Sequence, residues 1–329
     1  MTGQPGTIRL PARDIAVPST VSAQAQAVMA NPPPADAGPP PALDDPAAWR
    51  ASIAAHDGAI AAMMAGRAGT AKVTVDSRDL AGGGRVHEIT PDGLGDGDDR
   101  AYLDIHGGAF IYGGGDLCAT MATGTALRMA ARVWAVDYRM PPDHPFPAAL
   151  DDCLAAYRAL LAERRPERIV VGGASAGGNL AAALMLRARD EGLPLPAAVV
   201  LMTPAADLTE AGDSHQVNLG LDPLLTGSGQ QTFRLYAPGR DLHDPYLSPL
   251  NGDFSRGFPP AILTTGTRDM LLSDTVLLHR ALRRAGIPAE LHVTEAAGHG
   301  GFLGLAPEDQ EILGEVRRFA EAHWDRERL

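Results

Sequence analysis

The chain has 329 residues, of which 45% are hydrophobic and 21% are charged. A chain of this size and composition can bury a large core without disulfides or a structural metal. Its formal net charge of −12 at pH 7 argues against nucleic acid or an anionic membrane as a partner, because both attract clustered basic residues.

In chain order, residues 1–30 are mildly helical, and the proline-rich stretch 31–46 predicts a linker or extended segment, since proline fixes φ and lacks an N–H. From residue 71 onward, strands and helices alternate. The expected strands are 72–75, 85–89, 101–105, 133–136, 168–171, 197–202, 261–265 and 290–293. The expected helices are 47–65, 118–131, 148–163, 180–191, 274–285 and 307–324. This alternation predicts an α/β fold in which helices cover both faces of a mostly parallel sheet.

Residues 205–240 interrupt the alternation, because they mix polar and apolar positions without a clear strand. We expect an insertion there, above the carboxyl edge of the sheet. The chain then divides into an N-terminal part of a cap (1–65), a first part of the core (66–204), a cap insertion (205–240) and a second part of the core (241–329). The two cap parts should form a mobile lid, whose expected inward-facing side chains are Met29, Trp49, Ile53, Leu208, Leu225 and Phe233.

Neither a signal peptide nor a membrane span is visible in the sequence. The first residues lack a long apolar core, and no stretch reaches the ~18 apolar residues that a spanning helix requires. Cys118 and Cys153 have no metal-ligand spacing, so we expect buried, hydrophobic thiols rather than a disulfide or metal ligands. These features predict a soluble, cytoplasmic protein.

The strongest local motif is Gly173-Ala174-Ser175-Ala176-Gly177, between a predicted strand and a predicted helix. A nucleophile elbow requires this setting, because a sharp strand-to-helix turn exposes the serine hydroxyl. We therefore predict that Ser175 is a nucleophile. The alternative is a glycine-rich turn that exposes an inert serine.

A second motif, His106-Gly107-Gly108-Ala109-Phe110, follows the predicted strand 101–105. Acyl transfer needs preorganised N–H donors for the developing oxyanion. We predict that the N–H groups of Gly107, Gly108 and Ala176 form this oxyanion hole, and that His106 is a structural hydrogen-bonding residue. The nearby glycines 113–115 do not form a phosphate loop, since no Lys-Ser or Lys-Thr pair follows them.

An acid and a base should follow the serine in the order acid, then histidine. Asp269 comes after the predicted strand 261–265, whereas Asp274 resembles an N-terminal acid of the next helix. His299 lies in a glycine-rich loop after the last strand, whereas His279 and His292 lie within regular elements. We predict that Asp269 is the acid and His299 the base.

Together these motifs resemble the bacterial hormone-sensitive-lipase family of esterases, which have the α/β-hydrolase fold with a helical cap. Four further blocks also match that family: 137–152, 244–250, 258–260 and 284–288. The resemblance covers about residues 70–325. It implies a serine carboxylesterase that acts on a small-molecule ester of short to medium acyl chain, with the triad and oxyanion donors named above and with no cofactor or metal.

The resemblance implies the chemistry in more detail than it implies the substrate contacts or the oligomeric state. We expect Phe110, Leu208, Leu225 and Phe302 to contact the substrate. A homodimer is one assembly that the chain could form.

Three positions depart from the family pattern. Ala174 stands where the family usually has aspartate before the serine, so a polar contact near the elbow is missing. Ala109 replaces a third glycine, which should narrow the pocket. An extra glycine before Phe302 changes the spacing from His299.

Other functions share these motifs. A lactone, carbamate, amide or acetyl-ester hydrolase would use the same triad, since the motifs specify acyl transfer and not the leaving group. A true lipase fits less well, because only 5% of the chain is aromatic. A non-catalytic receptor of the same fold, such as the plant gibberellin receptors, lacks the histidine that His299 supplies here.

Overall fold

The computed structural model of the protein describes residues 8, 11–12, 14–31, 38–65, 72–95 and 97–324. Part of the predicted helical stretch before residue 14, and positions 32–37 of the predicted linker, lie outside the described residues. The strands are β1 (Val73–Asp79), β2 (Arg85–Pro91), β3 (Ala101–Ile105), β4 (Arg132–Asp137), β5 (Ile169–Ala174), β6 (Ala198–Met202), β7 (Ala261–Gly266) and β8 (Ala289–Thr294). The α-helices are α1 (Ala23–Ala30), α2 (Pro46–Ala65), α3 (Asp116–Met129), α4 (Ala148–Glu163), α5 (Ala176–Asp190), α6 (Ser214–Val217), α7 (Gln230–Tyr236), α8 (Leu272–Arg284) and α9 (Pro307–Trp324).

The strands form one sheet in the order β1-β2-β4-β3-β5-β6-β7-β8. The pairs β1/β2 and β2/β4 are antiparallel, and the remaining pairs are parallel. This confirms the predicted mostly parallel sheet. The register pairs Ala174 with Met202, so the ends of β5 and β6 meet at one edge. Parallel sheets place ligands beyond that carboxyl edge.

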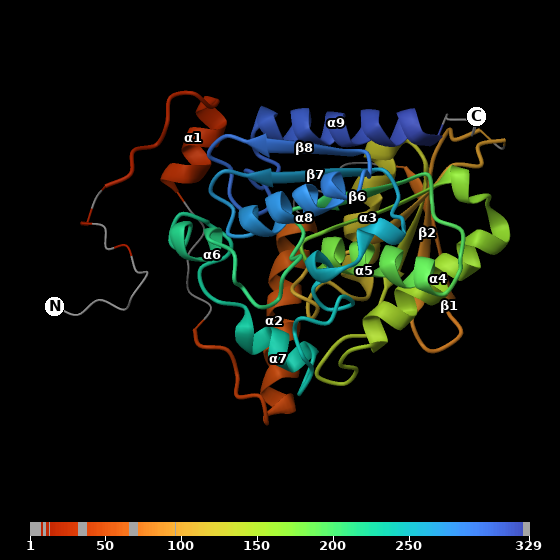
Figure 1. Cartoon of the computed structure of the whole chain (residues 1–329), viewed down its shortest axis with the longest axis horizontal. Helices are drawn as coiled ribbons and strands as arrows, with labels where there is room; N and C mark the ends of the chain where they lie inside the picture. The colour runs from red at the N-terminus through yellow and green to blue at the C-terminus, as the bar shows by residue number, and fades with distance from the viewer. Residues whose placement is uncertain are drawn as a thin grey trace.

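Helices cover both faces of the sheet, as the alternation predicted (Figure 1). One face packs against α3 and α9, and the other against α4, α5 and α8. Cys118 lies in the first of these cores and Cys153 in the second, and both are free, buried thiols, which confirms their predicted hydrophobic role. Among the helices of the described ranges, not one combines the length and apolar composition that a bilayer crossing requires.

Helix α5 begins four residues before the predicted start at residue 180. The prediction placed Gly177 and Gly178 before the helix, at the sharp turn where side chains would clash. In the structure both lie in the first turn of α5, where the helix approaches its neighbours closely. A Cβ at Gly178 would lie 3.0 Å from the Cβ of Pro204, and one at Gly177 would overlap the carbonyls of Ile105 and His106.

The N-terminal helices and the inserted helices α6 and α7 lie toward the side where β7 and β8 end (Figure 1). Ala25 of α1, and Val21 just before this helix, share a hydrophobic cluster with Ala297 and Phe302 of the chain after β8. Helix α2 instead packs on the chain after β3, where His56 stacks on Tyr112 with ring centroids 4.0 Å apart.

Candidate active site

Ser175 lies at the sharp turn between β5 and α5. Its backbone has φ 57° and ψ −120°, a conformation that a non-glycine residue adopts only when its surroundings enforce it. The flanking glycines allow this turn: a Cβ at Gly173 would lie 2.5 Å from the carbonyl carbon of Gly177. The elbow therefore holds the serine hydroxyl above the end of the sheet.

His299 lies in the glycine loop after β8, and its Nε2 is 2.9 Å from the Oγ of Ser175. Gly300 and Gly301 both have a φ of 74°, which glycine adopts without steric cost. Only 5% of His299 is exposed. This arrangement allows the imidazole to take the serine proton.

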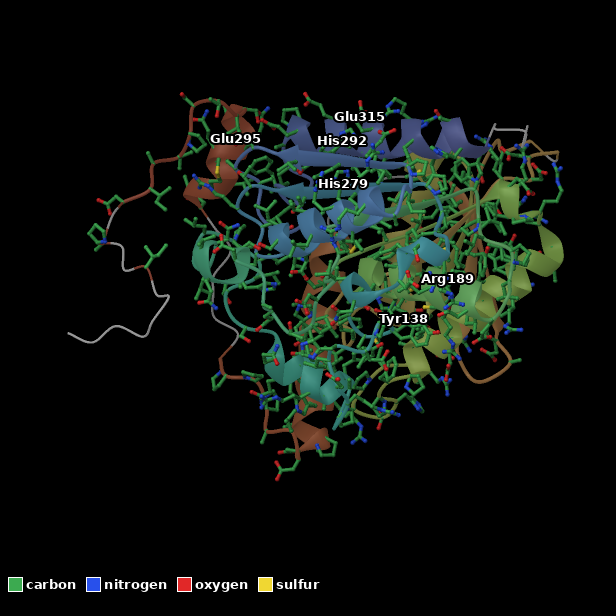
Figure 2. The ribbon with its side chains drawn as sticks, in the orientation of Figure 1. Tyr138, Arg189, His279, His292, Glu295 and Glu315 are labelled. Atoms are coloured by element: carbon green, nitrogen blue, oxygen red, sulfur yellow. The ribbon has the colours of Figure 1, made fainter. Side chains whose placement is uncertain are left out.

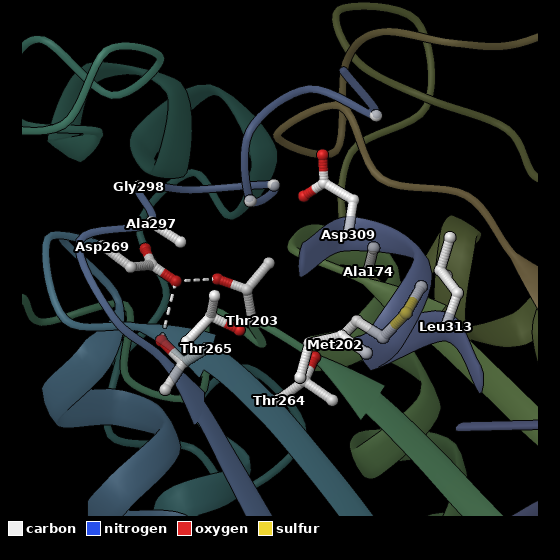
Figure 3. A pocket seen from close by; sticks show the side chains of 15 residues that line it. Ala174, Met202, Thr203, Thr264, Thr265, Asp269, Ala297, Gly298, Asp309 and Leu313 are labelled. Atoms are coloured by element: carbon white, nitrogen blue, oxygen red, sulfur yellow. Dashed lines mark hydrogen bonds between the residues drawn. The ribbon is translucent and has the colours of Figure 1, made fainter. Parts of the chain in front are cut away.

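Asp269 follows β7 and is fully buried. Its Oδ1 lies 3.2 Å from the Nδ1 of His299 and accepts the N–H of Leu271 at 2.8 Å. Its Oδ2 accepts the hydroxyls of Thr203 and Thr265, as Figure 3 shows. The sequence did not indicate either threonine, because a lone threonine after a strand has no distinguishing pattern.

Asp274, the alternative acid, lies 2.9 Å from a different histidine, His215. The other two candidate histidines lie on regular elements (Figure 2): His279 on α8, facing the carbonyl of Ala289, and His292 on β8, facing Glu290. The structure thus brings together the three predicted residues and keeps the alternatives apart from Ser175.

The charges in the triad favour an ionised acid. Burial opposes ionisation of Asp269, but the charge and hydrogen bond of His299, together with the hydrogen bonds from Thr203 and the Leu271 N–H, hold the pKa of Asp269 below its ordinary value. Burial likewise opposes protonation of His299, but the Asp269 carboxylate raises the pKa of His299 above its ordinary value. The site can therefore stabilise an imidazolium.

Two of the predicted oxyanion residues, Gly107 and Ala176, lie next to the serine. A Cβ at Gly107 would lie 2.9 Å from the Ala174 carbonyl and 3.5 Å from the Cβ of Ser175. Gly108 has a φ of 106°, and its carbonyl accepts the N–H of Tyr112 at 2.8 Å. Ala176 is the first residue of α5, where helical N–H groups have no partner within the helix.

His106 has the structural role that was predicted for it. Its Nδ1 lies 2.7 Å from the Gly107 carbonyl oxygen, and its ring stacks on Tyr138 at 4.0 Å. It thereby supports the turn that carries Gly107.

Comparison with known proteins places this geometry in a family. Residues 102–303 match a family model described as the alpha/beta hydrolase fold. The chain belongs to the α/β-hydrolase family. The hydrolase is also similar to the crystal structure of esterase E25, with a TM-score of 0.86 and 36% identity over 96% of this chain and 99% of that chain.

A second solved structure, an esterase from the bacterial hormone-sensitive lipase family, has a TM-score of 0.74 and 29% identity, covering 88% of this hydrolase and 94% of that chain. An acetyl-hydrolase of Streptomyces hygroscopicus is 38% identical over 58% of this chain and 64% of that protein. An esterase of Acinetobacter venetianus is 32% identical over 67% of this chain and 74% of that protein. These likenesses confirm the resemblance: the hydrolase is an ester-hydrolysing member of the hormone-sensitive-lipase family.

A cavity of about 90 Å³ opens in front of Ser175 in this hydrolase. Its walls are mostly apolar, and two of the predicted contact residues, Phe110 and Leu225, lie there. So does Phe233 from α7. Glu210 and His215, which the sequence did not single out, add polar groups to the lining.

The other two predicted contact residues lie elsewhere. Phe302 is 1% exposed and lies in a hydrophobic cluster with Ala25 of α1. Leu208 is fully buried in the main core. Neither lines the cavity at Ser175, so the expected substrate contacts at these two positions are corrected.

A separate cavity of about 180 Å³ lies behind the triad (Figure 3). Thr203 and Asp269 form one side, Asp309 and Leu313 of α9 another, and Ala174 faces it from β5. Ala174 is the position where the family usually has aspartate. The Ala174 methyl group does not fill this space, so the polar contact expected from an aspartate at this position is missing.

Proposed function

We propose that this hydrolase is a serine carboxylesterase in which Ser175 is the nucleophile, His299 the general base and Asp269 the residue that orients the base. One observation carries the assignment: a continuous chain of contacts runs from the Ser175 Oγ through both nitrogens of His299 to a buried carboxylate. Unrelated serine hydrolases use the same constellation.

The mechanism has two acyl transfers. His299 takes the Ser175 proton as the hydroxyl oxygen attacks the ester carbonyl, and Asp269 stabilises the resulting imidazolium. The N–H groups of Gly107, Gly108 and Ala176 hold the oxyanion. His299 then gives its proton to the departing alcohol. Water attacks the acyl-enzyme in the same way and releases the acid.

The size of the cavity at Ser175 supports esters of short to medium acyl chain. Its volume of about 90 Å³ is small beside the roughly 300–1,000 Å³ that is usual for ligand pockets. Phe110 and Phe233 close it with an edge-on contact, their ring centroids 6.3 Å apart. A relative named acetyl-hydrolase makes acetyl esters a necessary part of any substrate panel.

Residues 1–65 and 205–240 form the cap in this proposal. Three contacts support it: the Gln231 side chain of α7 donates to the Pro41 carbonyl, Asp57 of α2 accepts the N–H of Gly113 at 3.1 Å, and Leu225 lines the cavity at Ser175. The cytoplasmic location and the homodimer stay predictions.

The Ser175→Ala variant tests the assignment. It should hydrolyse none of a panel of p-nitrophenyl acetate, butyrate, octanoate and palmitate, and a fluorophosphonate probe should label the wild type at Ser175 alone. Rates of the wild type should be highest on acetate or butyrate. The Ser255→Ala variant is the control, because Ser255 is exposed and bonds to Asp253 within its own turn. Activity in the Ser175 variant would refute the nucleophile, and a maximum on palmitate would refute the substrate class.

A further inference from the structure

Asp222, in the cap insertion, is a carboxylate surrounded by backbone N–H groups. Only 3% of the residue is exposed. Its Oδ1 accepts the N–H groups of Leu224 and Leu225 at 2.9 and 3.0 Å, which shapes its own loop. Its Oδ2 accepts the N–H of Met270 at 2.9 Å and that of His299 at 3.1 Å.

The two bonds of Oδ2 reach both loops of the triad. Met270 directly follows the acid, Asp269, and His299 is itself the base. These loops leave the sheet from different strands, β7 and β8. A single oxygen of the cap therefore connects the acid loop to the base loop.

Neighbouring cap residues bond to the acid loop but not to the base loop. Asn218 donates from Nδ2 to the Asp269 carbonyl at 2.8 Å, and the Ser214 hydroxyl donates to the Met270 carbonyl at 2.6 Å. They fix the cap insertion against the acid loop. Asp222 then supplies the hydrogen bond from that fixed segment to the base.

We propose that Asp222 is a positioning residue that holds the acid loop and the base loop of the triad in register, and so links the cap to the catalytic geometry. This inference rests on the proposed roles of Ser175, Asp269 and His299. A backbone N–H that loses a buried acceptor must find another partner, and the loop that carries it then moves. A displacement of about 1 Å in a reacting group can cost about 10²-fold in rate.

The charge of Asp222 gives the proposal a readout that a purely structural role would lack. Three carboxylates raise the pKa of His299: those of Asp269, Asp222 and Asp274. Two further charged side chains lie near the base loop. Arg268 lines the same cavity as Asp222 and bonds to the Ala16 carbonyl and to the Met29 sulfur. Asp309 accepts the N–H groups of Phe302 and Ala306. Loss of the Asp222 charge should therefore lower the pKa of His299.

The Asp222→Asn variant removes this charge at nearly constant volume. The asparagine amide has one acceptor oxygen, whereas the carboxylate has two that each accept a pair of backbone N–H groups. The amide NH₂ must therefore face one of these two pairs of donors. We expect kcat on p-nitrophenyl butyrate to fall about 10²-fold with little change in KM. We also expect the acidic limb of the kcat/KM profile to move to lower pH.

The matched control is Asp309→Asn, which removes a carboxylate that accepts two N–H groups of the same loop, those of Phe302 and Ala306, rather than the N–H of His299. Its acidic limb should stay in place. Circular dichroism shows whether each variant folds. If Asp222→Asn does not fold, the same readouts are taken on Asp222→Ser, which lets water reach the N–H groups.

An unmoved acidic limb, or a loss of kcat no larger than that of the Asp309 variant, would overturn the role of Asp222. Failure of the proposed function would show differently: fluorophosphonate would not label Ser175 in the wild type. Labelling of the wild type with unchanged kinetics in the Asp222 variant would refute this inference alone.

Discussion

The Asp269→Asn substitution tests the triad most directly, because the surroundings of the carboxylate determine how an amide would sit there. The N–H of Leu271 is part of the backbone and cannot become an acceptor, so the amide oxygen should take the Oδ1 position beside it. The amide NH₂ then faces the hydroxyls of Thr203 and Thr265, which can rotate to accept. The variant should therefore keep the fold and the orientation of His299, and lose mainly the negative charge.

The size of the effect follows from the geometry. The carboxylate oxygen lies 3.2 Å from the His299 Nδ1. At this distance and an effective dielectric constant of about 20, a carboxylate attracts an imidazolium by about 5 kcal/mol. Since each ~1.4 kcal/mol in the barrier is tenfold in rate, kcat should fall by about 10³- to 10⁴-fold.

The assay is steady-state hydrolysis of p-nitrophenyl butyrate over a pH series, with Asp274→Asn as the matched control. Asp274 bonds to His215 and to the N–H of Asp207 rather than to His299, so its loss should cost far less. A larger loss in the Asp274 variant would show that the acid was chosen wrongly. An Asp269 variant that keeps a tenth of the wild-type kcat would refute the electrostatic reasoning.

Three further predictions follow from the same contacts. Because the pKa of His299 is raised and the base must be neutral, kcat/KM should fall as pH drops through a value above 6.5, which a pH–rate profile of the wild type measures; a limb below 6 would contradict this. The Asn179→Leu variant leaves two buried carbonyls without the hydrogen bonds that the Asn179 amide donates at 2.6 and 2.7 Å. Each unpaired carbonyl costs about 1–3 kcal/mol, so urea denaturation should show a loss of about 2–6 kcal/mol in the free energy of unfolding. Deletion of residues 1–45 removes α1 from the loop that carries His299, so kcat/KM should fall about 10- to 100-fold and the melting temperature should drop; unchanged values would mean that this segment is a dispensable terminus.

Local patterns in the sequence were sufficient to predict the strands and the main helices of the core, and to select the three residues that the structure brings together at Ser175. A nucleophile elbow depends on glycines within two residues of the serine, and an acid or base at the end of a parallel strand is apparent from the strand that precedes it. The hydrogen-bonded chain through Ser175, His299 and Asp269 joins residues chosen in this way. Such features can be predicted because each depends on a few neighbours along the chain.

Only the tertiary structure decided which side chains meet the triad from elsewhere. Thr203 and Asp222 lie far from Asp269 and His299 in sequence, and neither belongs to a motif, so their contacts exist only once β6, β7, β8 and the cap insertion come together. Phe302 shows the same limit: the sequence suggested a place at the site, but in the structure its ring is buried beside α1. An apolar residue is buried wherever partners are available, and the sequence alone does not say which partners those will be.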